Sequence, residues 1–79
     1  MTKSEEIVAI LKSIRPEFDF DNVENFFDEG MLDSFDVVNL VAVLEEKYHI
    51  KIAGTFILPE NFSNVTAIAA LLGRCGAAQ

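Results

Sequence analysis

The chain contains few cysteines, few basic residues and no long apolar run, and each scarcity excludes a class of protein. With Cys75 as the only cysteine among 79 residues, an internal disulfide and a single-chain zinc site built from several cysteines are excluded. Six lysines and arginines against 13 acids give a net charge of −7, which disfavours binding to nucleic acid or anionic membranes. No apolar run approaches the roughly 18 residues of a membrane span, and no basic segment precedes one as in a signal peptide. We therefore expect a cytoplasmic protein.

Apolar side chains are abundant, at 51% of all residues, which is enough for one packed core. This fraction argues against intrinsic disorder in spite of the acidity. We therefore expect a single domain over residues 1–79. Residues 74–79 have little to bury and are expected to form a mobile tail.

Apolar residues recur at helical spacing in three segments, which predicts an all-α fold. The first helix is expected at about 4–15, with Ser4 as its N-cap. The second is expected at 34–48, with an apolar face so wide that it must touch most other elements. The third should begin after Asn64.

Two further signals complete the helical pattern. Pro59 is suited to the first position of a short helix at 59–62. Gly73 is expected to end the last helix in a left-handed conformation.

Residues 16–32 form a long first loop in which acids alternate with aromatic side chains. The phenylalanines are expected to plug the core, each contributing roughly 1.5–3 kcal/mol if fully buried. The segment 19–24 begins like a calcium-binding loop, but the sixth position is not glycine and the twelfth is Gly30 rather than glutamate. We therefore predict no specific metal site.

The stretch 30–36 joins this loop to the second helix. Gly30 can relieve backbone strain where the loop turns. Asp33 and Ser34 are both N-cap residue types, and Asp36 follows Asp33 at the spacing of a loose capping box. The pattern predicts an exposed serine hydroxyl at a helix N-terminus, where a phosphate ester is favoured. Without further context, a plain helix cap is the commonest role of such a serine.

The motif around Ser34 and the helix pattern after it resemble acyl carrier proteins over about residues 3–73. The residues that carry the likeness are Gly30, Met31, Leu32, Asp33, Ser34, Phe35, Val37, Val38, Leu40, Val41, Leu44, Glu45, Glu46 and Tyr48. In that family, the serine of an Asp-Ser-Leu-type motif carries 4′-phosphopantetheine. The resemblance implies a four-helix bundle of three main helices and one short helix, with a long first loop. It also implies Ser34 as the attachment residue and Asp33 as support for the motif.

The resemblance further implies a carrier that is a substrate of enzymes rather than an enzyme. A phosphopantetheinyl transferase would link the arm from coenzyme A to Ser34, a ligase would load an acyl or aminoacyl group, and acyl-transfer enzymes would receive it. The chain has no Ser-His-Asp set and no glycine-rich phosphate loop, which agrees with a non-catalytic role. We expect a monomer with no nucleic-acid partner.

In the resembled family, the second helix is the surface on which basic patches of partner enzymes dock. Asp36, Glu45 and Glu46 match its acidic pattern and are the expected docking residues, together with Phe35. Leu32 and Phe35 are also expected to bury their side chains on either side of the serine.

The cargo stays open, because fatty acyl, polyketide, alanyl and other aminoacyl thioesters all suit such a carrier. The connection ending in residues 58–62 looks more like that of carriers from dedicated or aminoacyl pathways. Two other interpretations also stay open. One is a small acidic helical interaction module without a prosthetic group, and the other is a switch phosphorylated at Ser34.

Overall fold

The structure is a computed structural model that describes residues 2–20 and 23–76. Its elements are α1 (Lys3–Ile14), α2 (Ser34–Tyr48), the 3₁₀ helices η1 (Gly54–Phe56) and η2 (Pro59–Asn61), and α3 (Val65–Arg74). The described residues form no strand, and the predicted all-α fold is confirmed. The short helix predicted at 59–62 is present as η2.

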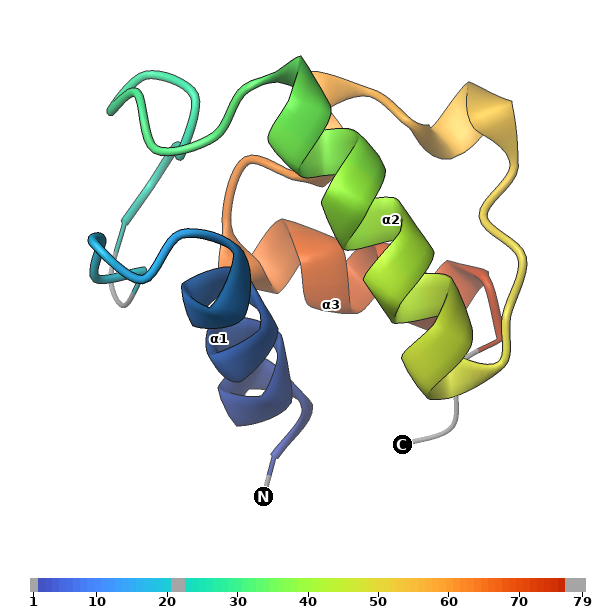
Figure 1. Cartoon of the computed structure of the whole chain (residues 1–79). Coiled ribbons are helices and arrows are strands. Elements are labelled where there is room, and N and C mark those ends of the chain that lie inside the picture. Colours follow the sequence, from blue (N-terminus) through green and yellow to red (C-terminus); the bar gives the residue numbers. More distant parts are fainter. Residues whose placement is uncertain (1, 21–22, 77–79) are drawn as a thin grey trace.

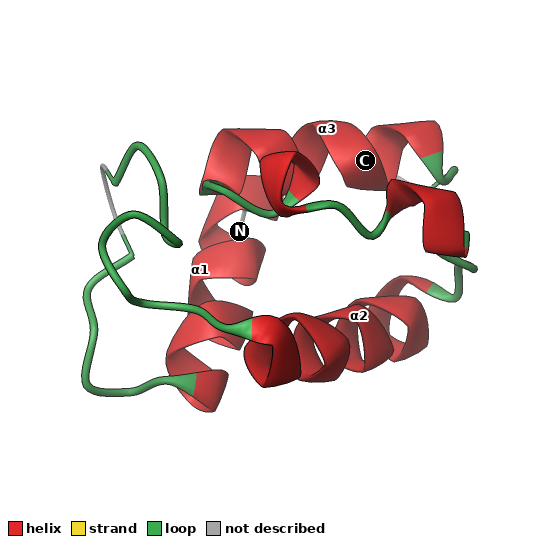
Figure 2. Cartoon of the chain, turned by 90° about the horizontal axis from the view of Figure 1, so that it is seen from above, coloured by secondary structure: helices red, strands yellow, loops and turns green. Residues whose placement is uncertain are grey.

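The three α-helices enclose the core, and α1 packs against both α2 and α3 (Figure 1). Seen from above, the long first loop lies at one end of the bundle and η1 at the other (Figure 2). The first loop leads directly into the start of α2, so its packing helps to place that start in space relative to the other helices.

The start of α1 differs from the prediction, because Thr2 and not Ser4 is its N-cap. The Thr2 hydroxyl accepts a hydrogen bond from the Glu5 N–H at 3.1 Å, and the Glu5 carboxylate accepts one from the Thr2 N–H at 2.9 Å. These two bonds form a complete capping box. The backbone hydrogen bond from Thr2 lowers the pKa of the Glu5 carboxyl.

One hydrophobic core is shared by the three α-helices, the first loop and the link between α2 and α3. Its fully buried side chains are Ile7, Leu11, Phe20, Phe26, Leu40, Leu44, Phe62, Ile68, Leu71 and Leu72. The prediction that loop phenylalanines plug the core is confirmed for Phe20 and Phe26. Their rings meet edge to face, with centroids 5.2 Å apart. These aromatics hold the long first loop against the bundle.

The start of α3 is as predicted, with Asn64 as its N-cap. The Asn64 side chain accepts a hydrogen bond from the Ala67 N–H at 2.7 Å. Its amide nitrogen donates to the Glu24 carbonyl at 2.9 Å. The same residue therefore begins α3 and fastens the first loop to it.

The end of α3 corrects two predictions. The helix does not stop at Gly73 but runs to Arg74, and the glycine in the left-handed region is Gly76, with φ +87°. Cys75 is half-buried and packs against the core. Ordered packing therefore extends beyond residue 74, where the tail was expected to begin, and residues 77–79 lie outside the described part of the chain.

Candidate functional site

The segment before α2 is held on the core by its own backbone and side chains. Gly30 has φ +70°, a left-handed conformation that glycine adopts without strain, as predicted. The Met31 N–H donates to the Phe26 carbonyl at 2.8 Å. The side chains of Met31 and Leu32 are buried. The chain thus arrives at α2 anchored by two apolar side chains.

Asp33 and Asp36 form a capping box at the start of α2. The Asp33 carboxylate accepts a hydrogen bond from the Asp36 N–H at 3.0 Å, and the Asp36 carboxylate accepts one from the Asp33 N–H at 3.2 Å. The loose capping box predicted from the sequence is therefore confirmed, with aspartate in the place of the usual Glu or Gln. The Asp36 N–H lowers the pKa of the Asp33 carboxyl.

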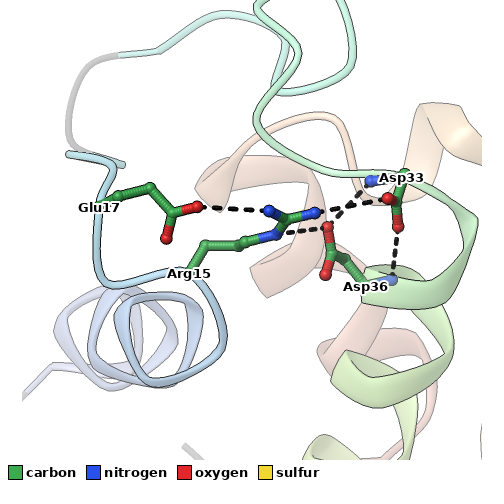
Figure 3. Close-up of polar contacts among 4 residues, drawn as sticks. All are labelled: Arg15, Glu17, Asp33 and Asp36. Carbon is green, nitrogen blue, oxygen red and sulfur yellow. Dashed lines mark hydrogen bonds and ion pairs between the residues drawn. The ribbon is translucent and has the colours of Figure 1, made fainter.

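Arg15, the C-cap of α1, joins this box from the neighbouring helix (Figure 3). Its Nε donates to Asp36 Oδ2 at 2.9 Å, and its Nη2 lies 3.4 Å from Asp33 Oδ2. Its third nitrogen, Nη1, lies 3.3 Å from Glu17 Oε2. The hydrogen bond to Asp36 raises the pKa of Arg15, so the guanidinium is charged throughout the working pH range. We call Arg15, Glu17, Asp33 and Asp36 the Arg15 cluster.

The cluster corrects the expected role of Asp36 as a docking residue. Its side chain is only 9% exposed and is bonded to Arg15 and to the backbone of Asp33. A partner protein has no access to a carboxylate in this position. Asp36 is buried because the third position of the helix closes the capping box and faces the end of α1.

A second expected docking acid, Glu45, also has a partner within the chain. Glu45 is half-buried, and its carboxylate accepts a hydrogen bond from the Ile52 N–H at 2.8 Å. This bond fastens the link after α2 to the helix. Of the three acids named from the sequence, Glu46 alone is an exposed residue.

The expectation for the two apolar neighbours of Ser34 is confirmed for Leu32 and wrong for Phe35. Leu32 is 5% exposed, whereas Phe35 is 82% exposed. Val38, one helical turn further along, is 64% exposed. The face of α2 that turns inward carries Leu40, Val41 and Leu44, so Phe35 and Val38 lie on an outward apolar strip of the same helix.

Ser34 is the first residue of α2 and is exposed. Within residues 2–20 and 23–76, its hydroxyl forms no hydrogen bond. The plain-cap interpretation of Ser34 is therefore wrong, because the side chain of Asp33 is the cap. Among the described residues, nothing bonds to this hydroxyl, which leaves it available to a molecule from solution.

The described residues contain no group of three or more potential metal-ligating side chains. Asp21 and Asn22, which belong to the calcium-loop pattern, lie outside the residues that the structure describes. No helix in the described ranges has the length and apolar character needed to cross a membrane.

An all-α domain that presents an unbonded serine hydroxyl at a helix start fits the covalent attachment of a phosphate ester. Residues 5–72 match the family model of the phosphopantetheine attachment site. The chain belongs to this family, and the resemblance drawn from the sequence is confirmed. The prosthetic group of the family is 4′-phosphopantetheine, and its domains are carriers. No curated protein matches the chain at a significant level.

Proposed function

We propose that Ser34 carries 4′-phosphopantetheine and that the chain is a carrier of acyl or aminoacyl groups. The observation that supports this most strongly is that Ser34 is exposed and that its hydroxyl forms no hydrogen bond with the described residues. When attached, the arm supplies a thiol that binds cargo as a thioester. The partial positive charge at the start of α2 favours the phosphodiester that links Ser34 to the arm.

A separate phosphopantetheinyl transferase attaches the arm. The Ser34 oxygen forms a new bond to the phosphorus that bears the pantetheine of coenzyme A. The phosphoanhydride bond breaks, the adenosine bisphosphate leaves and the hydroxyl proton is released. The chain contributes the position of the nucleophile, while the transferase supplies the catalytic groups.

We further propose that Phe35, Val38 and Glu46 form the surface of α2 that partner enzymes contact. Two exposed apolar side chains within the first turns of α2 are close to the attachment residue in sequence and lie outside the core. Glu46 is the exposed acid that remains for a basic patch on the transferase, the loading ligase or an acyl-transfer enzyme. Asp36 and Glu45 instead form hydrogen bonds within the chain, with Arg15 and with the Ile52 N–H.

Intact-protein mass spectrometry after incubation with coenzyme A and a phosphopantetheinyl transferase tests the attachment. The wild-type protein is expected to gain the mass of one arm, and Ser34→Ala to gain nothing. Ser4→Ala is the matched control, because Ser4 is an exposed serine in the first turn of α1, whose N-cap is Thr2. Wild-type protein that stays unmodified with several transferases would contradict the proposal. A phosphate-sized adduct that requires a kinase would support the phosphorylated switch instead.

The cargo can be identified directly on protein isolated from its source. Thioesters are released by hydroxylamine, so the released group can be identified by mass spectrometry. Recovery of a fatty acyl, polyketide, alanyl or other aminoacyl derivative would assign the pathway class. Protein that carries the arm but never a thioester would contradict the carrier function.

A further inference from the structure

Arg15 lies where the end of α1 meets the start of α2, in contact with both carboxylates of the α2 capping box (Figure 3). We propose that Arg15 is a positioning residue for the modification of Ser34. By holding Asp33 and Asp36, it fixes the turn from which the hydroxyl projects. The inference rests on the proposed attachment of the arm to Ser34.

The two residues of the capping box, Asp33 and Asp36, lie on either side of Ser34 and close to it in sequence. Asp36 Oδ2 accepts hydrogen bonds from both the Asp33 N–H and Arg15 Nε. Because the Asp36 side chain is nearly buried, removal of the guanidinium would leave a buried carboxylate without its cation. The Asp36 carboxylate would then rotate toward water and lose its hydrogen bond with the Asp33 N–H, which closes the capping box. The orientation of Ser34, which lies between these two aspartates in the sequence, would then be lost.

Arg15 joins the start of α2 to the end of α1 across a separation of 21 positions in the sequence. The two helices are separated in sequence by the long first loop, whereas Arg15 connects them directly. A guanidinium has several donors in a fixed planar arrangement, so it can hold two carboxylates at once. A lysine ammonium at the same place would keep the charge but not this fixed geometry.

Arg15 is also the cation among three carboxylates close to Ser34. Glu17, Asp33 and Asp36 surround one guanidinium, and attachment of the arm adds a phosphodiester at the residue next to Asp33. Without Arg15, the incoming phosphate of coenzyme A would meet three carboxylates and no compensating cation within the Arg15 cluster. Both geometry and charge therefore predict slower transfer when Arg15 is replaced.

Steady-state kinetics of arm transfer, with the whole chain as substrate, test the proposal. For Arg15→Met, kcat is expected to fall about tenfold while KM for the carrier changes less than about twofold, because the hydroxyl is misplaced and the outer face of α2 is unchanged. Lys12→Met removes the same charge from an exposed position of α1 and should match the wild type. Circular dichroism establishes that each variant is folded at the assay temperature.

Two further variants separate positioning from stability. Ile68→Val removes one buried methyl group from α3 and lowers stability without touching the Arg15 cluster. It should leave kcat unchanged, since a folded but less stable carrier still presents Ser34. Arg15→Lys should give a kcat between those of wild type and Arg15→Met.

The proposal would be overturned if Arg15→Met were modified as fast as the wild type, or if Ile68→Val slowed transfer equally. Arg15→Lys as fast as the wild type would show that charge alone is sufficient and would contradict the geometric role. If Ser34 of the wild type is not modified at all, the proposed function fails rather than the role of Arg15. The two failures are therefore distinguishable in one set of assays.

Discussion

The helices α1 and α2 both begin with a reciprocal capping box, but the surroundings of the two boxes differ. The box of Thr2 and Glu5 is exposed and consists of two reciprocal hydrogen bonds between those residues. In the box of Asp33 and Asp36, the second carboxylate is buried and bonded to Arg15 of the preceding helix. The first box starts α1. The second starts α2 and also fixes the position of that start relative to α1. Ser34 lies beside the second box.

The largest predicted difference concerns Asp36. Asp36→Ala removes one side of the box and the most buried of the three carboxylates bonded to Arg15, so the free energy of unfolding should fall by about 2 kcal/mol. Because Arg15 is partly exposed, it can turn to solvent, and the loss stays below that of a fully buried pair. Urea unfolding measures the change. A loss no larger than that caused by removing the α1 cap would contradict the distinction between the two boxes.

The other end of α2 offers a comparison with its start. The Tyr48 hydroxyl donates to the Glu6 carboxylate at 2.7 Å, which ties the end of α2 to α1. Burial of the hydroxyl, and after it this hydrogen bond, raise the pKa of Tyr48. Tyr48→Phe should lower the free energy of unfolding by about 1.5 kcal/mol. The rate of Ser34 modification should stay unchanged, because the bond is at the far end of the helix, and a slowed transfer would count against local control by the Arg15 cluster.

Thr2→Ala tests the isolated box. Loss of an exposed N-cap should lower the free energy of unfolding by about 1 kcal/mol. The change should leave the modification of Ser34 unaffected, since Thr2 begins α1. Thermal unfolding and the transfer assay measure the two effects on one sample. Slower transfer by Thr2→Ala would indicate that the two boxes are coupled.

The pH dependence of stability offers the finest comparison. The pKa values of Glu5 and Asp33 are lowered in the folded protein, chiefly by backbone hydrogen bonds from Thr2 and Asp36. A carboxyl with a depressed folded pKa stabilises the fold above its unfolded pKa, and the contribution is lost as pH falls through the folded value. Stability should therefore decrease on acidification below about pH 4. Unfolding curves of Glu5→Gln and Asp33→Asn should each show a smaller acid-induced loss than wild type.

Signals that act over a few residues could be predicted from the sequence. The bounds of α2, the Asp33–Asp36 box and the Asn64 cap all follow from neighbouring residue types. The Thr2 cap could also have been found, because Glu5 stands at the capping-box spacing from Thr2, whereas Ile7 stands at that spacing from Ser4.

Features that depend on tertiary contacts could not be predicted in this way. Arg15 and Asp36 are 21 positions apart, and no local pattern joins them. The rotation of α2 about its axis was also ambiguous, since its apolar residues extend around much of the helix. Asp36, which pairs with Arg15, occupies the position of α2 that faces α1. Phe35 therefore lies on the solvent-exposed side of the helix.

The proposed carrier function depends on attachment of the arm to the hydroxyl of Ser34. Peptide mapping by tandem mass spectrometry, on protein co-produced with a phosphopantetheinyl transferase, locates the arm on the chain. The expected result is a single arm located on Ser34. An arm found on any other residue, or none under conditions that modify a known carrier, would contradict it.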